Sequence, residues 1–202
     1  MKTARLKLDV LLNPFYKGKE TKNGKTGTVV PYNPFIKNNK RKMAIETEAK
    51  IKLNREEFDK LIKILGKPAF FPQKNTIYKL KEGMFRIREE NGKRIITYKG
   101  ELKKGKFKSL EEVEFKTDSD VDKLKRFFSV LGHKETMFIE KQRANYNYVG
   151  CVVSLDILNG NNYFIEIEGK IENIEKCLKK LGLQDKKFEK RSYMEILKHN
   201  NT

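Results

Sequence analysis

The chain has 202 residues, with 45 Lys and Arg against 27 Asp and Glu, and therefore a formal net charge of +18. This excess predicts an anionic partner, which the composition leaves open between a nucleic acid, a phosphorylated small molecule and a membrane surface. No apolar run approaches the length that spans a membrane, and Cys151 and Cys177 form no zinc-finger or disulfide pattern with the two distant histidines. We therefore expect ordinary interior thiols, no membrane span and a reducing, cytoplasmic setting.

Residues 1–42 differ in composition from the rest of the chain. They contain eleven Lys and Arg against Asp9 and Glu20, a net charge of +9, which is half of the total excess in a fifth of the chain. Three prolines and the near-repeat NPFYK and NPFIK are typical of an extended or disordered segment. We predict a basic, flexible extension over 1–42 and a folded domain over 43–202. The extension is either a solvated tail, which we favour, or an anchor for RNA or anionic lipid, and it is the only part of the chain where we expect nucleic acid to bind.

The folded part begins with a pattern of alternating apolar and polar residues that recurs along the chain. This alternation predicts eight strands, at 44–52, 75–80, 84–90, 94–100, 108–116, 135–146, 149–158 and 162–169. Helical periodicity predicts four helices, at 55–65, 120–131, 171–181 and 192–198. Asn91-Gly92 is typical of a tight hairpin turn between the third and fourth strands. The order of elements predicts an α+β protein dominated by antiparallel sheet.

Like charges recur on one face of several predicted strands. Glu46, Glu48 and Lys50 share a face because alternate side chains of a strand point the same way. The same spacing joins Arg86 with Arg88, Glu112 with Glu114, Lys141 with Arg143, and Glu166 with Glu168. For any one strand, an ordinary solvent-facing side is the simpler interpretation. Together, the pairs of like charge favour compensating ligands, namely divalent cations for the carboxylates and phosphates for the basic groups. A closed barrel of eight strands would place all of them in one lumen, with helices packed outside.

Seven segments, in order, resemble the CYTH proteins, a family of triphosphate tunnel metalloenzymes. They are Glu46-x-Glu48-x-Lys50, Phe85-Arg86-Ile87-Arg88, Thr97-Tyr98-Lys99-Gly100, Glu112-x-Glu114, the run IEKQR ending at Arg143, Leu155-Asp156, and the run FIEIE ending at Glu168. The resemblance covers 44–197 and implies an eight-stranded antiparallel β-barrel with helices outside. Within the family, the closing Arg191-Ser192-Tyr193 is most similar to the class IV adenylyl cyclase branch. Two positions depart from the pattern of many relatives, which have Arg where this chain has Leu110 and a Gly-Leu-Gly turn where it has Gly160-Asn161-Asn162. The resemblance implies that these departures affect the substrate end of the tunnel.

The resemblance also implies roles for the charged residues. The carboxylates would hold Mg²⁺ or Mn²⁺, since hard cations prefer carboxylate oxygens: Glu46, Glu48, Glu112, Glu114, Glu166 and Glu168. The basic groups would bind the triphosphate: Lys50, Arg86, Arg88, Lys99, Lys141 and Arg143. We expect Glu46, Glu48, Lys141, Arg143 and Asp156 to act in catalysis. Asp156 could hold a metal, orient Arg143 or accept a proton, whereas we expect Tyr193 to pack the last helix rather than stack on a base.

The implied function is an enzyme acting on a triphosphate, of which ATP is the substrate we favour. Our first interpretation is a class IV-type adenylyl cyclase, which converts ATP to cyclic AMP and pyrophosphate. The second is a triphosphatase for tripolyphosphate, thiamine triphosphate or an RNA 5′ end, because the same charged lumen serves both reactions. A third is a module that binds a polyphosphate or nucleotide without turnover. The sequence leaves the oligomeric state open, a homodimer included.

Overall fold

The computed structural model describes residues 45–199. The extension predicted over 1–42, with any contact it makes to nucleic acid or lipid, lies outside the described residues and stays a prediction. Within 45–199 no helix is long and apolar enough to cross a membrane.

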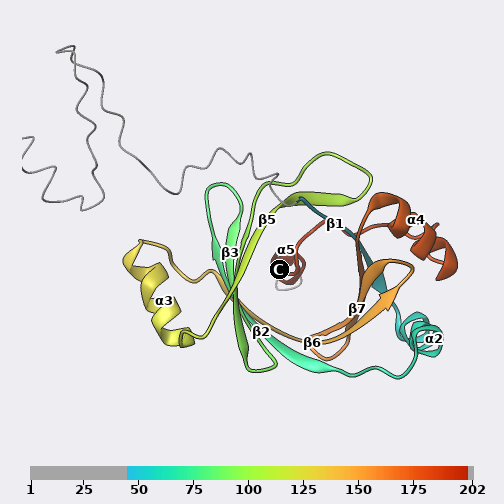
Figure 1. Ribbon diagram of the computed structural model, residues 1–202, viewed down its shortest axis with the longest axis horizontal. Helices are drawn as coiled ribbons and strands as arrows, with labels where there is room; N and C mark the ends of the chain where they lie inside the picture. Colours follow the sequence, from blue (N-terminus) through green and yellow to red (C-terminus); the bar gives the residue numbers. More distant parts are fainter. Residues whose placement is uncertain (1–44, 200–202) are drawn as a thin grey trace, which may run out of the picture. The chain divides into compact units, whose positions relative to one another are not determined.

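Eight antiparallel strands close into a barrel, which confirms the predicted fold class (Figure 1). The strands are β1 (Ile45–Leu53), β2 (Phe71–Lys79), β3 (Met84–Glu90), β4 (Lys93–Lys99), β5 (Lys108–Thr117), β6 (Met137–Tyr148), β7 (Cys151–Leu158) and β8 (Asn162–Glu168). Around the ring, their order is β1-β5-β4-β3-β2-β6-β7-β8. Neighbours in the chain are therefore neighbours in the ring except where a helix intervenes, as after β1 and β5.

The strand boundaries match the predicted ones to within a few residues, with β2 as the largest difference. This strand begins at Phe71, four residues before the predicted start. Phe71 and Pro72 pair only with β6, whereas the pairing of β2 with β3 begins at Gln73. Pro72 has no N–H to donate, so it fits a position where only one neighbour is present. The predicted Asn91-Gly92 turn is confirmed, with both residues at positive φ.

Three helices cover the apolar outer face of the barrel. They are α2 (Arg55–Leu65), α3 (Val121–Val130) and α4 (Ile171–Lys180). α2 and α4 contribute Phe58 and Ile174 to the largest core cluster, which includes the outward side chains of β1, β7 and β8. α3 contributes Phe128 to a second cluster over β2, β3 and β4. Most apolar residues thus face outward from the sheet under helices, and the charged residues face the lumen.

The fourth helix of the described part, α5 (Tyr193–His199), lies against one end of the barrel. In Figure 1 it is seen inside the outline of the strands. Met194 and Ile196 pack against four lumen-facing or end residues in a third apolar cluster: Ile77, Ile139, Leu158 and Phe164. All six side chains of this cluster are buried, so the cluster fills the part of the barrel end that α5 covers.

The two cysteines are free, buried thiols, as predicted. Cys151 begins β7 and Cys177 lies on α4, in the core cluster under that helix. Burial raises the pKa of both thiols, that of Cys177 to about 12. At neutral pH they are protonated, which suits a packing role.

Candidate functional site

The barrel encloses a cavity of about 870 Å³. All twelve side chains predicted to bind metal or phosphate line it, which means that the structure brings them together: Glu46, Glu48, Lys50, Arg86, Arg88, Lys99, Glu112, Glu114, Lys141, Arg143, Glu166 and Glu168. Asp156 is the exception among the predicted site residues. Its side chain has no exposed surface and lies behind Lys141 and Arg143.

Carboxylates occupy three strands that are adjacent in the ring, β8, β1 and β5. Register places Glu48 opposite Glu168 across β1 and β8, and β5 contributes Glu112 and Glu114. We call the lumen side of these three strands the acidic wall. Partial burial, followed by the charge of Glu46, raises the pKa of Glu168 to about 7. Negative charge is thus concentrated enough here to oppose the ionisation of one of its own members.

Basic groups gather on the opposite side of the ring, on β3 and β6, with β2 between them. We call this side the basic wall; its charged members are Arg86, Arg88, Lys141 and Arg143. Burial and the charges of Arg86 and Arg143 lower the pKa of Arg88 to about 9. Arg88 donates from Nε to Oδ1 of Asn75 on β2 at 3.1 Å. Positive charge is therefore crowded on this wall, as it is in sites that bind polyanions.

One donor atom of the basic wall has no partner within the described residues. Nε of Arg86 is buried and makes no hydrogen bond, while its Nη2 donates to Thr97 Oγ1 at 3.0 Å. Buried guanidinium donors are almost always satisfied, so an unpaired one inside a cavity indicates a missing acceptor. Phosphate oxygens are acceptors that match arginine well.

Ammonium groups neutralise the acidic wall in this structure. Lys99 Nζ lies 2.5 Å from Oε2 of both Glu46 and Glu112. Lys108 Nζ donates to Glu48 Oε1 at 2.8 Å. Lys50, the third residue of the opening motif, lies 3.2 Å from Glu166. Lys50 and Lys99, predicted to bind phosphate, are thus found on carboxylates. Two guanidinium groups of the basic wall also contact the acidic wall, because Arg143 donates to Glu166 and Arg86 Nη2 lies 3.7 Å from Glu114.

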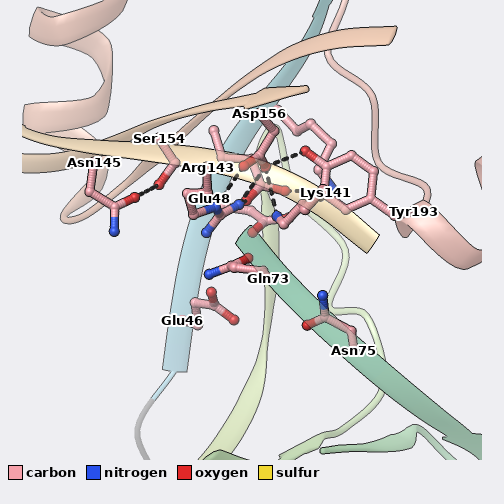
Figure 2. Close-up of polar contacts among 12 residues, drawn as sticks. Glu46, Glu48, Gln73, Asn75, Lys141, Arg143, Asn145, Ser154, Asp156 and Tyr193 are labelled. Carbon is pink, nitrogen blue, oxygen red and sulfur yellow. Dashed lines mark hydrogen bonds and ion pairs between the residues drawn. The ribbon is translucent and has the colours of Figure 1, made fainter. Parts of the chain in front are cut away.

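Asp156 is the centre of a buried network that Figure 2 shows. Its Oδ1 accepts from Arg143 Nε at 2.7 Å, and its Oδ2 accepts from Arg143 Nη2 at 2.5 Å and from Lys141 Nζ at 2.7 Å. The hydroxyl of Tyr193 donates to the same Oδ2 at 2.6 Å. Burial opposes its ionisation, but the charges of Arg143 and Lys141 hold the pKa of Asp156 below its ordinary value. This geometry is that of a group that orients Arg143, one of the three roles considered for it.

Several members of the site were not predicted, and Lys108 and Tyr193 are the two that contact predicted site carboxylates most directly. Lys108 faces the lumen two residues before Leu110, so the alternation that marked Glu112 and Glu114 could also have indicated it. Tyr193 does pack, edge to face on Phe164 with ring centroids 5.1 Å apart, but its hydroxyl also reaches Asp156. No sequence signal gives that contact, because it depends on which barrel end α5 covers.

The residues of the acidic wall fit a divalent cation by their chemistry. Carboxylate oxygens are the ligands that Mg²⁺ and Mn²⁺ prefer, and the wall holds six carboxylates. Within residues 45–199, no three of them converge into a ready-made ligand group. Lysines stand between them instead, so cation binding requires side chains such as Lys99 to move.

A closed eight-stranded antiparallel barrel with helices packed outside matches the triphosphate tunnel fold. The CYTH domain profile matches residues 44–193, and the chain belongs to this family.

Individual relatives agree with that assignment. A protein of Methanocaldococcus jannaschii, named provisionally as an adenylate cyclase, is 28% identical over 174 residues, which cover 75% of this chain and 98% of the relative. The solved structure of PH1819 from Pyrococcus horikoshii is 31% identical, with a TM-score of 0.62, and the match covers 77% of this chain and 99% of that one. A Hippeastrum protein described as having a dominant triphosphatase activity shares the fold at 19% identity and a TM-score of 0.61, over 77% of this chain and 96% of that one.

Proposed function

We propose that this protein is a metal-dependent enzyme that binds a triphosphate in the barrel lumen and converts ATP to cyclic AMP and pyrophosphate. The observation that carries the proposal is the division of the lumen into an acidic and a basic wall on opposite sides of the ring. A triphosphate has a high negative charge that the basic wall neutralises, while the acidic wall supports the cation that such substrates carry.

The basic wall binds the phosphates in this proposal. Arg86, Arg88, Lys141 and Arg143 supply donors to the non-bridging oxygens, and the unpaired Nε of Arg86 is the donor most in need of an acceptor. Asp156 holds Arg143 through two hydrogen bonds, so the guanidinium keeps one orientation before substrate arrives. Lys50 and Lys99, which contact carboxylates in this structure, are further phosphate ligands in this proposal.

In this proposal the acidic wall would hold Mg²⁺ or Mn²⁺ through carboxylates chosen from Glu46, Glu48, Glu112, Glu114, Glu166 and Glu168. When bound, the ion supplies a Lewis acid that neutralises charge on the phosphates during bond breaking. Glu46 and Glu48 begin the wall on β1 and are the members we expect catalysis to need most.

In the cyclase reaction, the ribose 3′-hydroxyl gives its proton to water and its oxygen bonds to the α-phosphorus, while the bond from that phosphorus to the departing pyrophosphate breaks. The charge that develops on pyrophosphate is stabilised by the basic wall. Met84, Leu102 and Leu110 give the cavity part of its apolar lining, which suits the nucleoside part of ATP. The name of the Methanocaldococcus relative supports the same choice.

Triphosphate hydrolysis is the second candidate, because the basic wall and the acidic wall suit it as well as they suit the cyclase reaction. Asp156 does not separate the two reactions. Its carboxylate is fully buried and accepts from three side chains, so it is poorly placed to take a proton from either a ribose hydroxyl or an attacking water. The lumen makes its charged contacts with phosphate whatever group the triphosphate carries. The dominant activity described for the Hippeastrum protein is of this kind.

Product analysis separates the candidates. The protein is incubated with ATP and Mg²⁺ or Mn²⁺, and cyclic AMP, pyrophosphate and orthophosphate are measured together, with tripolyphosphate as a parallel substrate. Cyclic AMP with equimolar pyrophosphate supports the cyclase, whereas orthophosphate without cyclic AMP supports the hydrolase. Tight binding of these compounds with no product under either cation refutes both reactions and leaves the binding module.

A further inference from the structure

Tyr193 is the one residue of α5 whose side chain joins the buried network of the lumen within the described residues. Its ring packs on Phe164, and Met194 and Ile196 behind it fix the helix in the apolar cluster at the barrel end. A packing role for the ring needs no hydroxyl. The hydroxyl nevertheless donates to Asp156 in the lumen network, and packing of the ring does not account for this contact.

The hydroxyl completes the coordination of Asp156. Oδ2 of this carboxylate accepts three hydrogen bonds, from Tyr193 at 2.6 Å, Lys141 at 2.7 Å and Arg143 at 2.5 Å (Figure 2). Burial and the charge of Asp156 raise the pKa of Tyr193 well above its ordinary value, so the phenol keeps its proton and stays a donor. With three donors around it, the carboxylate has little freedom to rotate. Because Lys141 and Arg143 are hydrogen-bonded to it, the positions of their charged groups are restricted as well.

The ring of Tyr193 also contacts two ammonium groups, one from β1 and one from β6. Lys50 Nζ lies 4.4 Å and Lys141 Nζ 4.6 Å from the ring centroid, both within cation–π range. Lys50 donates in addition to the carbonyl oxygen of Arg191, two residues before Tyr193, at 3.3 Å. The start of α5 therefore contacts basic groups of both β1 and β6.

We infer that Tyr193 is a positioning residue, which sets the geometry of Lys50, Lys141 and Arg143 for phosphate and so couples docking of the C-terminal helix to the readiness of the phosphate site. The inference rests on the proposed function, because it assumes that these three groups bind a triphosphate. It goes beyond that function in making substrate affinity depend on a helix outside the barrel sheet.

The test compares conservative variants by a measurement that needs neither metal nor turnover. Binding of inorganic tripolyphosphate is measured by calorimetry in metal-free buffer, and thermal unfolding is recorded for each variant. Tyr193→Phe keeps the ring and removes the hydroxyl, and we expect it to weaken tripolyphosphate binding about tenfold, the size of a lost hydrogen bond to a charged group. Tyr193→Leu also removes both cation–π contacts, and we expect a further loss.

Two control variants separate positioning from stability. Tyr163→Phe makes the same chemical change at a tyrosine of β8 whose hydroxyl accepts from Arg55, and we expect unchanged binding. Ile174→Ala lowers stability in the core cluster under α4, which contains no residue of α5, and we expect a lower unfolding temperature with binding within about twofold of wild type, because α5 and the Asp156 contacts are untouched.

The outcomes distinguish the inference from the function. Weaker binding in Tyr193→Phe, with a higher KM and little change in kcat for the triphosphate, supports positioning. Wild-type affinity in Tyr193→Phe, or failure of that variant to fold, overturns the inference and leaves the proposed function standing. Absence of both tripolyphosphate binding and triphosphate turnover in the wild type overturns the two together.

Discussion

Lys99 reaches across two strand boundaries to Glu46. Its Nζ lies 2.5 Å from Oε2 of Glu46, although β4 and β1 are separated in the ring by β5. Glu112 of β5 receives the same ammonium at the same distance. A positive side chain thus stands between two carboxylates of the acidic wall, where the proposed function requires a metal ion. Lys99 and a divalent cation should therefore compete for these oxygens.

Removing the Lys99 charge should reveal that competition. In Lys99→Met we expect tighter binding of Mn²⁺ to the free protein, by about tenfold, because Glu46 and Glu112 lose their internal cation. We expect weaker binding of tripolyphosphate in the same variant, because a phosphate ligand is lost. Free Mn²⁺ measured by electron paramagnetic resonance tests the first expectation and calorimetry the second. Weaker Mn²⁺ binding in Lys99→Met would show that the two cations do not compete.

Neutralising the first carboxylates of the acidic wall should remove turnover. We expect Glu46→Gln and Glu48→Gln each to lower kcat by at least about a hundredfold, because an amide oxygen carries no charge to hold the metal. Glu111→Gln is the matched control. Glu111 neighbours Glu112 on β5 but lies outside the lumen set, so its variant should retain activity. Full activity in either of the first two variants contradicts their metal role.

The alternating strands made much of this site predictable. Because side chains of a strand alternate between two faces, the spacing of Glu46, Glu48 and Lys50 placed them on one face. The like charges on the other strands and the family resemblance indicated that this face is the lumen, where all three residues are found. The contact between Lys99 and Glu46 did not follow. It depends on the register of β4, β5 and β1, which is a property of the closed barrel.

Burial of Asp156 was equally beyond the sequence. Its place on β7 puts the side chain on the lumen side of the sheet. The sequence does not say whether the carboxylate is exposed to the cavity or covered by its neighbours. Whether it is covered depends on Lys141, Arg143 and Tyr193, which come from β6 and from a helix 37 residues further along the chain. Alternation along a strand determines which face of the sheet a side chain takes. The side chains that it contacts there depend on the tertiary fold.

Lys141 should give phosphate binding a pH dependence near neutrality. Burial and the charge of Arg143 lower the pKa of Lys141 to about 7, against the attraction of Asp156. The ammonium form dominates below that pH and the neutral amine above it, so tripolyphosphate binding should weaken as pH rises through about 7 to 8. Lys141→Met should lack this step. Because the titration of tripolyphosphate itself is common to both proteins, the difference between their pH profiles reports Lys141, and identical profiles would contradict the assignment.

The same shift predicts the sign of a stability effect. In the unfolded chain the pKa of Lys141 has its ordinary value of 10.5, so between about pH 7 and that value the unfolded state binds more protons than the folded one. The contribution of Lys141 to the free energy of unfolding should therefore rise with pH across this window. Denaturant unfolding of wild type and Lys141→Met at pH 6.5 and 9 measures it as a pH-dependent difference between the two proteins. A wild-type stability that falls relative to the variant as pH rises would refute it.

Substitutions in the core under α4 should lower the free energy of unfolding without changing the ratio of products. Ile174 is fully buried among the outward side chains of the barrel, whereas Ile171 on the same helix is 55% exposed. Ile174→Ala should lower the free energy of unfolding by about 2–5 kcal/mol, through lost burial and the cavity left behind, and Ile171→Ala by less than about 1 kcal/mol. Both variants should keep the wild-type ratio of products while folded, because neither residue contacts the lumen. A changed product ratio in Ile174→Ala would mean that the outer core also shapes the site, since the strands that carry the acidic wall on one face carry this core on the other.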